Sequence, residues 1–310
     1  MPPEAGTRRG VLLGAAMGAA LLALETGEVR LGLGGVTALV GLVPVAVGLA
    51  LGGPVAAGLA VLVGVGGAAA VLGGSAAAVL ALRHGVPGLA LGVALVRRLS
   101  LALSLVLVGA VSLVTLTLLV WAYLPPGTGA LALVERQLQA HVAEWERVPG
   151  ALGLPTDPAV VAESARLVTT AMRVAGPAVL LLGLLLGALT NYVAARLCVR
   201  GGGFRRFAEE AVPDHLVWGV IAGGVGLVSG ADMLERIGLN LLVVLAALYA
   251  IQGLAVLRHF FERVRVPGTL QGVSFGLFAV QPLLLIAVAC LGLSDLWVDF
   301  RKIRQVPTPA

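Results

Sequence analysis

Four polar side chains inside apolar segments are the residues of this chain whose types could recognise a ligand. Asn191, Asn240, Tyr249 and Gln252 lie in stretches that otherwise consist mainly of Leu, Val, Ala and Gly. The spacing of Tyr249 and Gln252 puts them on one face of a helix, one turn apart. Such side chains either hydrogen-bond to a neighbouring helix or line a groove that binds a small molecule. We take the four as a candidate ligand groove, with both interpretations open.

The chain carries no recognisable catalytic or metal-binding motif. HExxH, GxSxG, SxxK and Walker A patterns are absent, and the 4 histidines are scattered near the ends of predicted helices. Cys198 and Cys290 form no CxxC motif and are expected to be packing residues. No charged residue falls in the middle of a securely predicted membrane span, where it would suggest ion coupling. We therefore expect a non-enzymatic protein without catalytic residues, cofactor or metal site, and without ion-coupled transport.

Two ladders of small residues mark the first apolar segment. Gly6, Gly10, Gly14 and Gly18 are spaced four apart, and a second ladder is formed by Ala15, Ala19 and Ala23. Small residues at this spacing let membrane helices approach closely. The ladders serve either internal packing or docking of another membrane subunit, and the alanines are the candidate docking face.

The C-terminal segment has an unusual mixture of aromatic and charged residues. Its motif consists of Gly292, Asp295, Trp297, Asp299, Phe300 and Arg301. One interpretation is a helix at the membrane edge with local ion pairs, which contribute little stability when exposed. The other is a functional segment.

The composition explains why these residues must sit on membrane helices. Hydrophobic residues make up 59% of the chain, charged residues only 12%, and the mean hydropathy is +1.01. Soluble domains carry roughly 25% charged residues. The sequence therefore predicts an all-α, polytopic helical bundle embedded in a lipid bilayer. The net charge of +5 lies mostly in short loops, and no nucleic-acid-binding pattern accompanies it.

Eight or nine membrane spans are expected from helix length. They lie near residues 10–24, 31–50, 54–72, 75–96, 99–124, 215–230, 237–257 and 270–293, together with the apolar helix that ends at Arg196. The stretch 75–96 contains Arg83, His84 and Pro87, and is either a broken span or a hairpin; Pro282 could break the last span. Arg8 and Arg9 predict a cytoplasmic N-terminus in a bacterial inner membrane.

Residues 125–172 interrupt the apolar pattern. Leu131, Val134 and Leu138 begin a helical apolar repeat that continues to Trp145, with mixed charges on the other face. We expect an extracytoplasmic amphipathic helix here. The predicted organisation is thus N-terminal membrane helices over 1–124, the insertion over 125–172, and C-terminal membrane helices with the tail over 173–310.

The C-terminal half resembles the YybS-like family of predicted bacterial membrane proteins, domain of unknown function 2232. The resemblance rests on the tail motif, on Asn240, on the stretch from Tyr249 through Gln252 to Ala255, and on Pro213, Leu216, Val217 and Trp218. That family is distantly similar to the S-components of energy-coupling-factor importers and to MreD-like shape proteins. S-components dock through an Ala-x-x-x-Ala first helix, which Ala15, Ala19 and Ala23 match, but they have fewer spans than predicted here.

Two functions follow as expectations. The first is a small-molecule or lipid-binding subunit of a transporter. The alternative is a membrane scaffold or regulator of the cell-envelope or division machinery that acts through helix–helix contacts with a partner.

Overall fold

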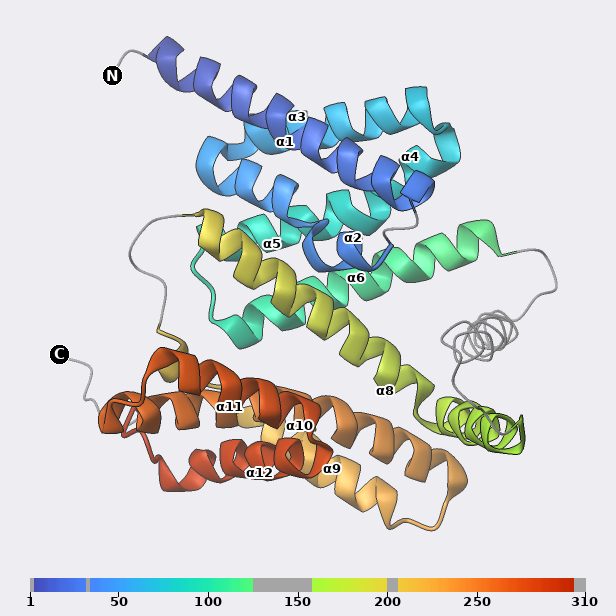
Figure 1. Cartoon of the computed structure of the whole chain (residues 1–310), viewed down its shortest axis with the longest axis vertical. Coiled ribbons are helices and arrows are strands. Elements are labelled where there is room, and N and C mark those ends of the chain that lie inside the picture. The colour runs from blue at the N-terminus through green and yellow to red at the C-terminus, as the bar shows by residue number, and fades with distance from the viewer. Residues whose placement is uncertain (1–2, 32–33, 125–157, 200–205, 304–310) are drawn as a thin grey trace.

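The computed structural model describes residues 3–31, 34–124, 158–199 and 206–303, and within these ranges every regular element is a helix. Figure 1 shows two groups of helices, an N-terminal group from α1 to α6 and a C-terminal group from α9 to α12. The long helix α8 (Pro158–Cys198) runs between them. It contacts α2, α3 and α6 on one side and α10 on the other, so it joins the two groups.

The N-terminal group is built around the pairing of α1 with α3. Its elements are α1 (Pro3–Leu31), α2 (Gly34–Val40), α3 (Val43–Val71), α4 (Gly74–Leu80), a π-helix (Ala81–Gly85), α5 (Val86–Val96) and α6 (Leu101–Tyr123). A Cβ atom at Gly14 would lie 2.6 Å from the Ala56 carbonyl oxygen, and one at Gly18 would lie 2.6 Å from Val63 Cβ. The glycine ladder therefore serves internal packing, because only hydrogen side chains permit this approach.

A sharp break in α3 lies between two of the predicted spans. Gly53 has a φ of 71°, which an L side chain rarely adopts, and Pro54 follows it. The two halves of α3 fold back on each other at this break, since a Cβ atom on Gly48 would lie 3.7 Å from the Ala57 Cα, nine residues away. By length and composition alone, Thr37–Val71 counts as one candidate span. The break lies between the two spans predicted near 31–50 and 54–72, and the number of crossings here stays a prediction.

The segment around Arg83 and His84 is a continuous helix. Residues Gly74–Val96 form one candidate span in which the π-helix replaces an α-helical turn. The hairpin expected as one alternative is therefore wrong. A π-helical segment carries an extra residue within the turn, which re-aims the side chains near it and often marks a functional site.

The C-terminal group consists of α9 (Val217–Leu227), α10 (Asp232–Val264), α11 (Gly268–Val280) and α12 (Pro282–Val298), preceded by the short 3₁₀ turns Phe207–Glu209 and Asp214–Leu216. Residues 268–278 and 283–298 meet at an angle of 105°, as the proline in the predicted last span suggested. Helix α9 is part of the apolar helix Asp214–Leu227, which is too short to count as a membrane span.

The described residues contain six helices long and apolar enough to cross a membrane, or up to seven if the bent pair is one span. The predicted eight or nine are not confirmed. The amphipathic helix predicted from residue 131 to residue 145 lies outside the described residues, and the predicted boundary at residue 172 falls inside α8. Large apolar side chains such as Leu12, Leu62 and Leu283 are at least 68% exposed, as expected for helices that face lipid.

Candidate functional site

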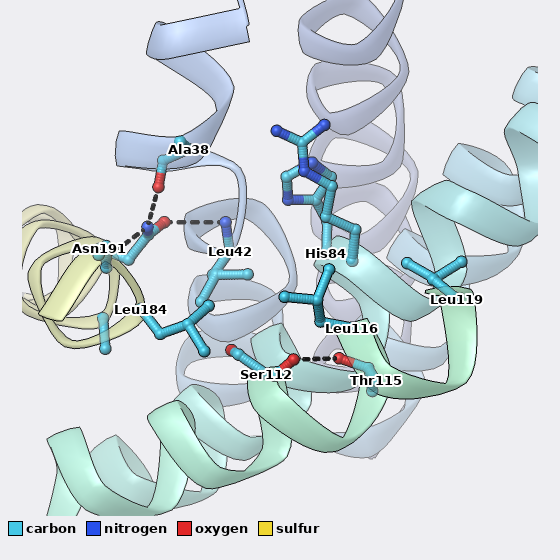
Figure 2. A pocket seen from close by; sticks show the side chains of 13 residues that line it. Ala38, Leu42, His84, Ser112, Thr115, Leu116, Leu119, Leu184 and Asn191 are labelled. Atoms are coloured by element: carbon cyan, nitrogen blue, oxygen red, sulfur yellow. Dashed lines mark hydrogen bonds between the residues drawn. The ribbon is translucent and has the colours of Figure 1, made fainter. Parts of the chain in front are cut away.

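A cavity of about 250 Å³ lies between the α2–α3 junction, the π-helix, α6 and α8. Figure 2 shows its wall, in which Leu42, Leu116, Leu119 and Leu184 supply apolar surface. Polar groups come from Arg83, His84, Ser112, Thr115 and Asn191. A mostly apolar hollow with a few polar groups is the usual form of a small-molecule site.

Asn191 holds one side of this cavity together. Its Oδ1 accepts a hydrogen bond from the Leu42 backbone N–H at 2.8 Å, and its Nδ2 donates to the Ala38 carbonyl at 2.9 Å. Nδ2 also donates to the Gly187 carbonyl at 2.8 Å. Figure 2 shows this side chain reaching from α8 to the break between α2 and α3. The amide satisfies backbone groups that the break leaves without helical partners, so Asn191 shapes the cavity.

Unlike Asn191, the His84 side chain makes no hydrogen bond to the described residues. Its side chain comes from the π-helix, it is only 3% exposed, and neither ring nitrogen has a hydrogen-bond partner among the described residues. Its Nε2 lies 3.6 Å from Oε2 of Glu25, and that oxygen also accepts no hydrogen bond from the part of the chain that the structure describes. Buried polar atoms without partners cost about 1–3 kcal/mol each and need an explanation.

Glu25 and Glu28 lie one turn apart on α1 and face the π-helix. Arg83 NH1 donates to Glu28 Oε1 at 2.5 Å, and the Thr37 hydroxyl donates to the other oxygen of Glu28. Oxygen atoms of Glu25 and Glu28 and a ring nitrogen of His84 all lie within 4.8 Å of one another. We call Glu25, Glu28 and His84 the buried triad; Glu25 and His84 are buried and Glu28 is half-buried.

None of the sequence patterns predicted the buried triad. The first span is predicted to end near residue 24, but α1 continues to Leu31, so both glutamates lie within the candidate span Thr7–Leu31. His84 was placed near a helix end, but it lies near the middle of Gly74–Val96. The expectation concerned the middle of securely predicted spans; 75–96 was not one of them, and Glu25 and Glu28 lie near the C-terminal end of α1. Ionisable groups nonetheless lie within the candidate spans, and these three residues could hold a metal ion. The usable signal was the spacing of Glu25 and Glu28 on one helical face.

The four residues of the predicted ligand groove do not line one cavity. Asn191 borders the cavity described above. Asn240, on α10, accepts from the Ala178 N–H at 2.7 Å and donates to the Val174 carbonyl at 2.9 Å. In a regular helix the Ala178 N–H would donate its hydrogen bond to the Val174 carbonyl. Asn240 therefore binds both groups of α8 beside Pro177, the proline inside that helix.

Tyr249 and Gln252 lie at another place, where α10 crosses α12. Tyr249 is 2% exposed. Gln252 accepts from the Val212 N–H at 2.8 Å and donates to Asp295 Oδ2 at 3.2 Å. These contacts agree with the interhelical interpretation of the polar residues; ligand binding at any of them stays a prediction.

The tail motif forms a buried clasp, which we call the Asp295–Arg301 clasp. Arg301 is 6% exposed, and its Nε and NH2 lie 3.2 and 2.7 Å from Asp295 Oδ2. NH1 donates to the carbonyls of Ala208 and Glu210 at 2.8 and 2.7 Å. The interpretation of weak ion pairs at a membrane edge is wrong for this pair, because charge-assisted bonds of a buried guanidinium are strong.

The other motif residues surround this clasp. Asp299 ends α12 with a φ of 47°, and the Phe300 ring lies 6.4 Å from that of Phe260. Trp297 is 67% exposed, as expected for an interfacial aromatic side chain. Gly292 faces Gly253, and a Cβ atom on Gly292 would lie 2.6 Å from the Gly253 nitrogen. The two segments that carry the family resemblance are thus brought together by the α10–α12 crossing.

The predicted docking face is open in the structure. Ala15, Ala19 and Ala23 are all exposed, whereas Gly14 and Gly18 beside them are buried against α3. Ala19 and Ala23 border a shallow apolar groove near the end of α1. No element of the described chain covers this face, so its use by a partner stays a prediction.

Comparisons with known proteins identify the family. No curated protein and no solved structure matches the chain. A family model described as a predicted membrane protein, DUF2232, matches residues 30–296. The matched residues include His84 of the buried triad and Asp295 of the Asp295–Arg301 clasp. The resemblance to the YybS-like family is confirmed, since that family is DUF2232. The chain belongs to the DUF2232 family of predicted membrane proteins.

Proposed function

We propose that this membrane protein binds a small molecule in the cavity between α2, the π-helix, α6 and α8, as the ligand-binding subunit of a transporter. The observation that carries the proposal is the cavity itself, with Arg83, His84 and Asn191 set in an apolar wall. Its volume of about 250 Å³ lies just below the range typical of drug-sized ligands. The ligand is therefore a compact metabolite or vitamin-sized molecule rather than a two-chain lipid.

The polar wall suggests the chemistry of this ligand. Arg83 offers guanidinium donors and is 37% exposed, and Asn191 and Thr115 also line the cavity. Donors in an apolar cavity select a molecule with a hydrogen-bond acceptor such as a carbonyl or carboxylate. The proposed role is binding, without a chemical step.

We place the protein in the bacterial inner membrane with its N-terminus in the cytoplasm, following the positions of Arg8 and Arg9.

Filling the cavity should abolish ligand binding. A leucine at Gly183 enters the cavity from α8, and a Cβ atom there meets no other atom within 4 Å, so the fold should tolerate it. Screening the purified full-length protein against metabolites and vitamins by thermal unfolding should yield a stabilising ligand, since a ligand at about 100 times its Kd adds ~2.7 kcal/mol. Gly183→Leu is expected to lose this stabilisation.

The matched control is Gly176→Leu. Gly176 lies on the same helix, also has open space for a Cβ atom, and does not border the cavity. It should keep the ligand response. The proposal fails if no compound stabilises the protein, or if Gly183→Leu responds as fully as Gly176→Leu.

The exposed Ala15, Ala19 and Ala23 favour the second candidate, a scaffold or regulator of envelope machinery that docks a partner helix there. Changing all three to leucine should then reduce co-purification of membrane partners from cells at least tenfold, because close approach needs small side chains. Ala70→Leu on α3, also exposed, is the control and should leave co-purification unchanged. Equal recovery of partners with both variants would remove the support for docking at this face.

A further inference from the structure

The buried triad has the composition of a cation site. Two carboxylates come from α1 and one imidazole from the π-helix, and one possible ligand atom of each lies within 4.8 Å of the others. Carboxylate oxygens and imidazole nitrogens bind Zn²⁺ at about 2.0–2.2 Å, in sites that often keep one position open. Small side-chain rotations would bring the three atoms to the spacing that such bonds require.

Unpartnered buried atoms supply the second observation. Glu25 is 4% exposed and His84 3%, and Glu25 Oε2 and both imidazole nitrogens lack hydrogen bonds among the residues described. The imidazole Nε2 faces Glu25 at 3.6 Å. A cation between them would give the carboxylate oxygen and the Nε2 lone pair the partner that each lacks.

The surrounding chain holds the imidazole in this position. A Cβ atom on Gly41 would lie 2.6 Å from His84 Cε1, so the absence of a side chain at residue 41 makes room for the ring. The π-helix places His84 on the side of Glu25 within a span that is otherwise α-helical. Tight packing and a π-helical turn at the same residue indicate a built site.

The two carboxylates of the buried triad favour a second cation in addition to Arg83. Arg83 pairs with Glu28 at 2.5 Å, and within the described parts of the chain Glu25 Oε2 has no cationic group at hydrogen-bond distance. Arg83 is 37% exposed at the cavity wall, so its side chain can withdraw from Glu28 when a metal takes that carboxylate. The imidazole selects a first-row transition metal over Mg²⁺ or Ca²⁺, which prefer oxygen ligands.

We propose that Glu25, Glu28 and His84 bind one divalent transition-metal ion, of the Zn²⁺ class, inside the helix bundle. The site lies beside the cavity but does not depend on the proposed ligand. Its three ligands leave a coordination position for water or another group.

The test measures metal binding by the purified full-length protein, prepared without a histidine tag and stripped with chelator. Titration with Zn²⁺, followed by gel filtration and elemental analysis, should give one ion per chain. Co²⁺ should give the visible absorption of a site with nitrogen and oxygen ligands. Mg²⁺ should bind at least tenfold more weakly than Zn²⁺.

Substitutions within the triad should weaken this binding. Glu25→Gln and His84→Gln are each expected to raise the Zn²⁺ Kd at least tenfold, whereas the control His215→Gln, outside the triad, should leave it unchanged. Arg83→Gln removes a competing cation from Glu28 and should bind Zn²⁺ at least as tightly as the unchanged protein.

Several results would overturn the proposal. One is that the unchanged protein binds no stoichiometric Zn²⁺. Another is that His84→Gln and His215→Gln bind Zn²⁺ with equal affinity. A third is that Arg83→Gln loses Zn²⁺ binding. Because the readout is bound metal rather than stabilisation by an organic ligand, its failure is distinguishable from failure of the cavity proposal.

Discussion

Replacing Arg301 with alanine is expected to lower the free energy of unfolding by about 3–5 kcal/mol, the usual cost of removing one partner of a buried ion pair. Asp295, 3% exposed, would keep a buried charge without its guanidinium. The carbonyls of Ala208 and Glu210 would also lose a donor. Reversible unfolding of the purified protein in mixed micelles, with increasing denaturing detergent, measures this change.

Two further variants isolate the cause. Lys302→Ala changes the adjacent cation, which is exposed, and should alter the free energy of unfolding by less than about 0.5 kcal/mol. The double variant Asp295→Leu with Arg301→Met removes both charges together and should recover part of the lost stability, as replacement of buried ion pairs by apolar residues often does. If Arg301→Ala were as stable as Lys302→Ala, the clasp would not hold the tail.

The second large effect is expected at the crossing of α10 and α12. Gly292→Ala would place a Cβ atom 2.6 Å from the Gly253 nitrogen, and also onto the Tyr249 carbonyl. Both obstacles are backbone atoms of α10, so no side-chain rotation relieves them and the helices must separate. We expect a loss of about 3 kcal/mol, the upper end of the usual cost of overpacking. The same unfolding titration measures it.

Gly276→Ala is the matched control. Gly276 lies in α11, where a Cβ atom meets nothing within 4 Å. Alanine there should leave stability unchanged or raise it by about 0.4–1 kcal/mol, because alanine has less conformational entropy to lose than glycine. Equal effects of the two substitutions would mean that close approach at Gly292 does not stabilise the crossing.

If these substitutions act as expected, the tail motif serves the stability of the fold. Gly292 and Asp295 meet Gly253 and Gln252 across one crossing, and Arg301 extends the network to the loop before α9. A carboxylate of that loop, Glu210, accepts a hydrogen bond at 2.8 Å from the Leu101 N–H at the start of α6. The motif therefore connects the tail to the N-terminal helices. The cavity and the buried triad lie elsewhere, against α8 and α1.

The sequence by itself determined the kind of protein. An apolar content of 59% with 12% charge requires a lipid environment, and in lipid the backbone must satisfy its hydrogen bonds within helices. The tail motif, and the segments around Tyr249 and Trp218, were enough to indicate the family. Breaks at Pro282 and near Gly53 were also visible, because proline and glycine act on the backbone locally.

Only the tertiary structure decided which polar groups meet. The spacing of Glu25 and Glu28 is visible in the sequence, but their distance to His84 depends on how α1 packs across α3 toward the π-helix. Arg301 could have paired with Asp299, two residues away, yet it binds Asp295 and carbonyls from another segment. Helix patterns report local periodicity, whereas contacts between helices depend on crossings set by small residues such as Gly14 and Gly292. For that reason the sequence indicated a membrane bundle, and the packing of its helices revealed the buried triad.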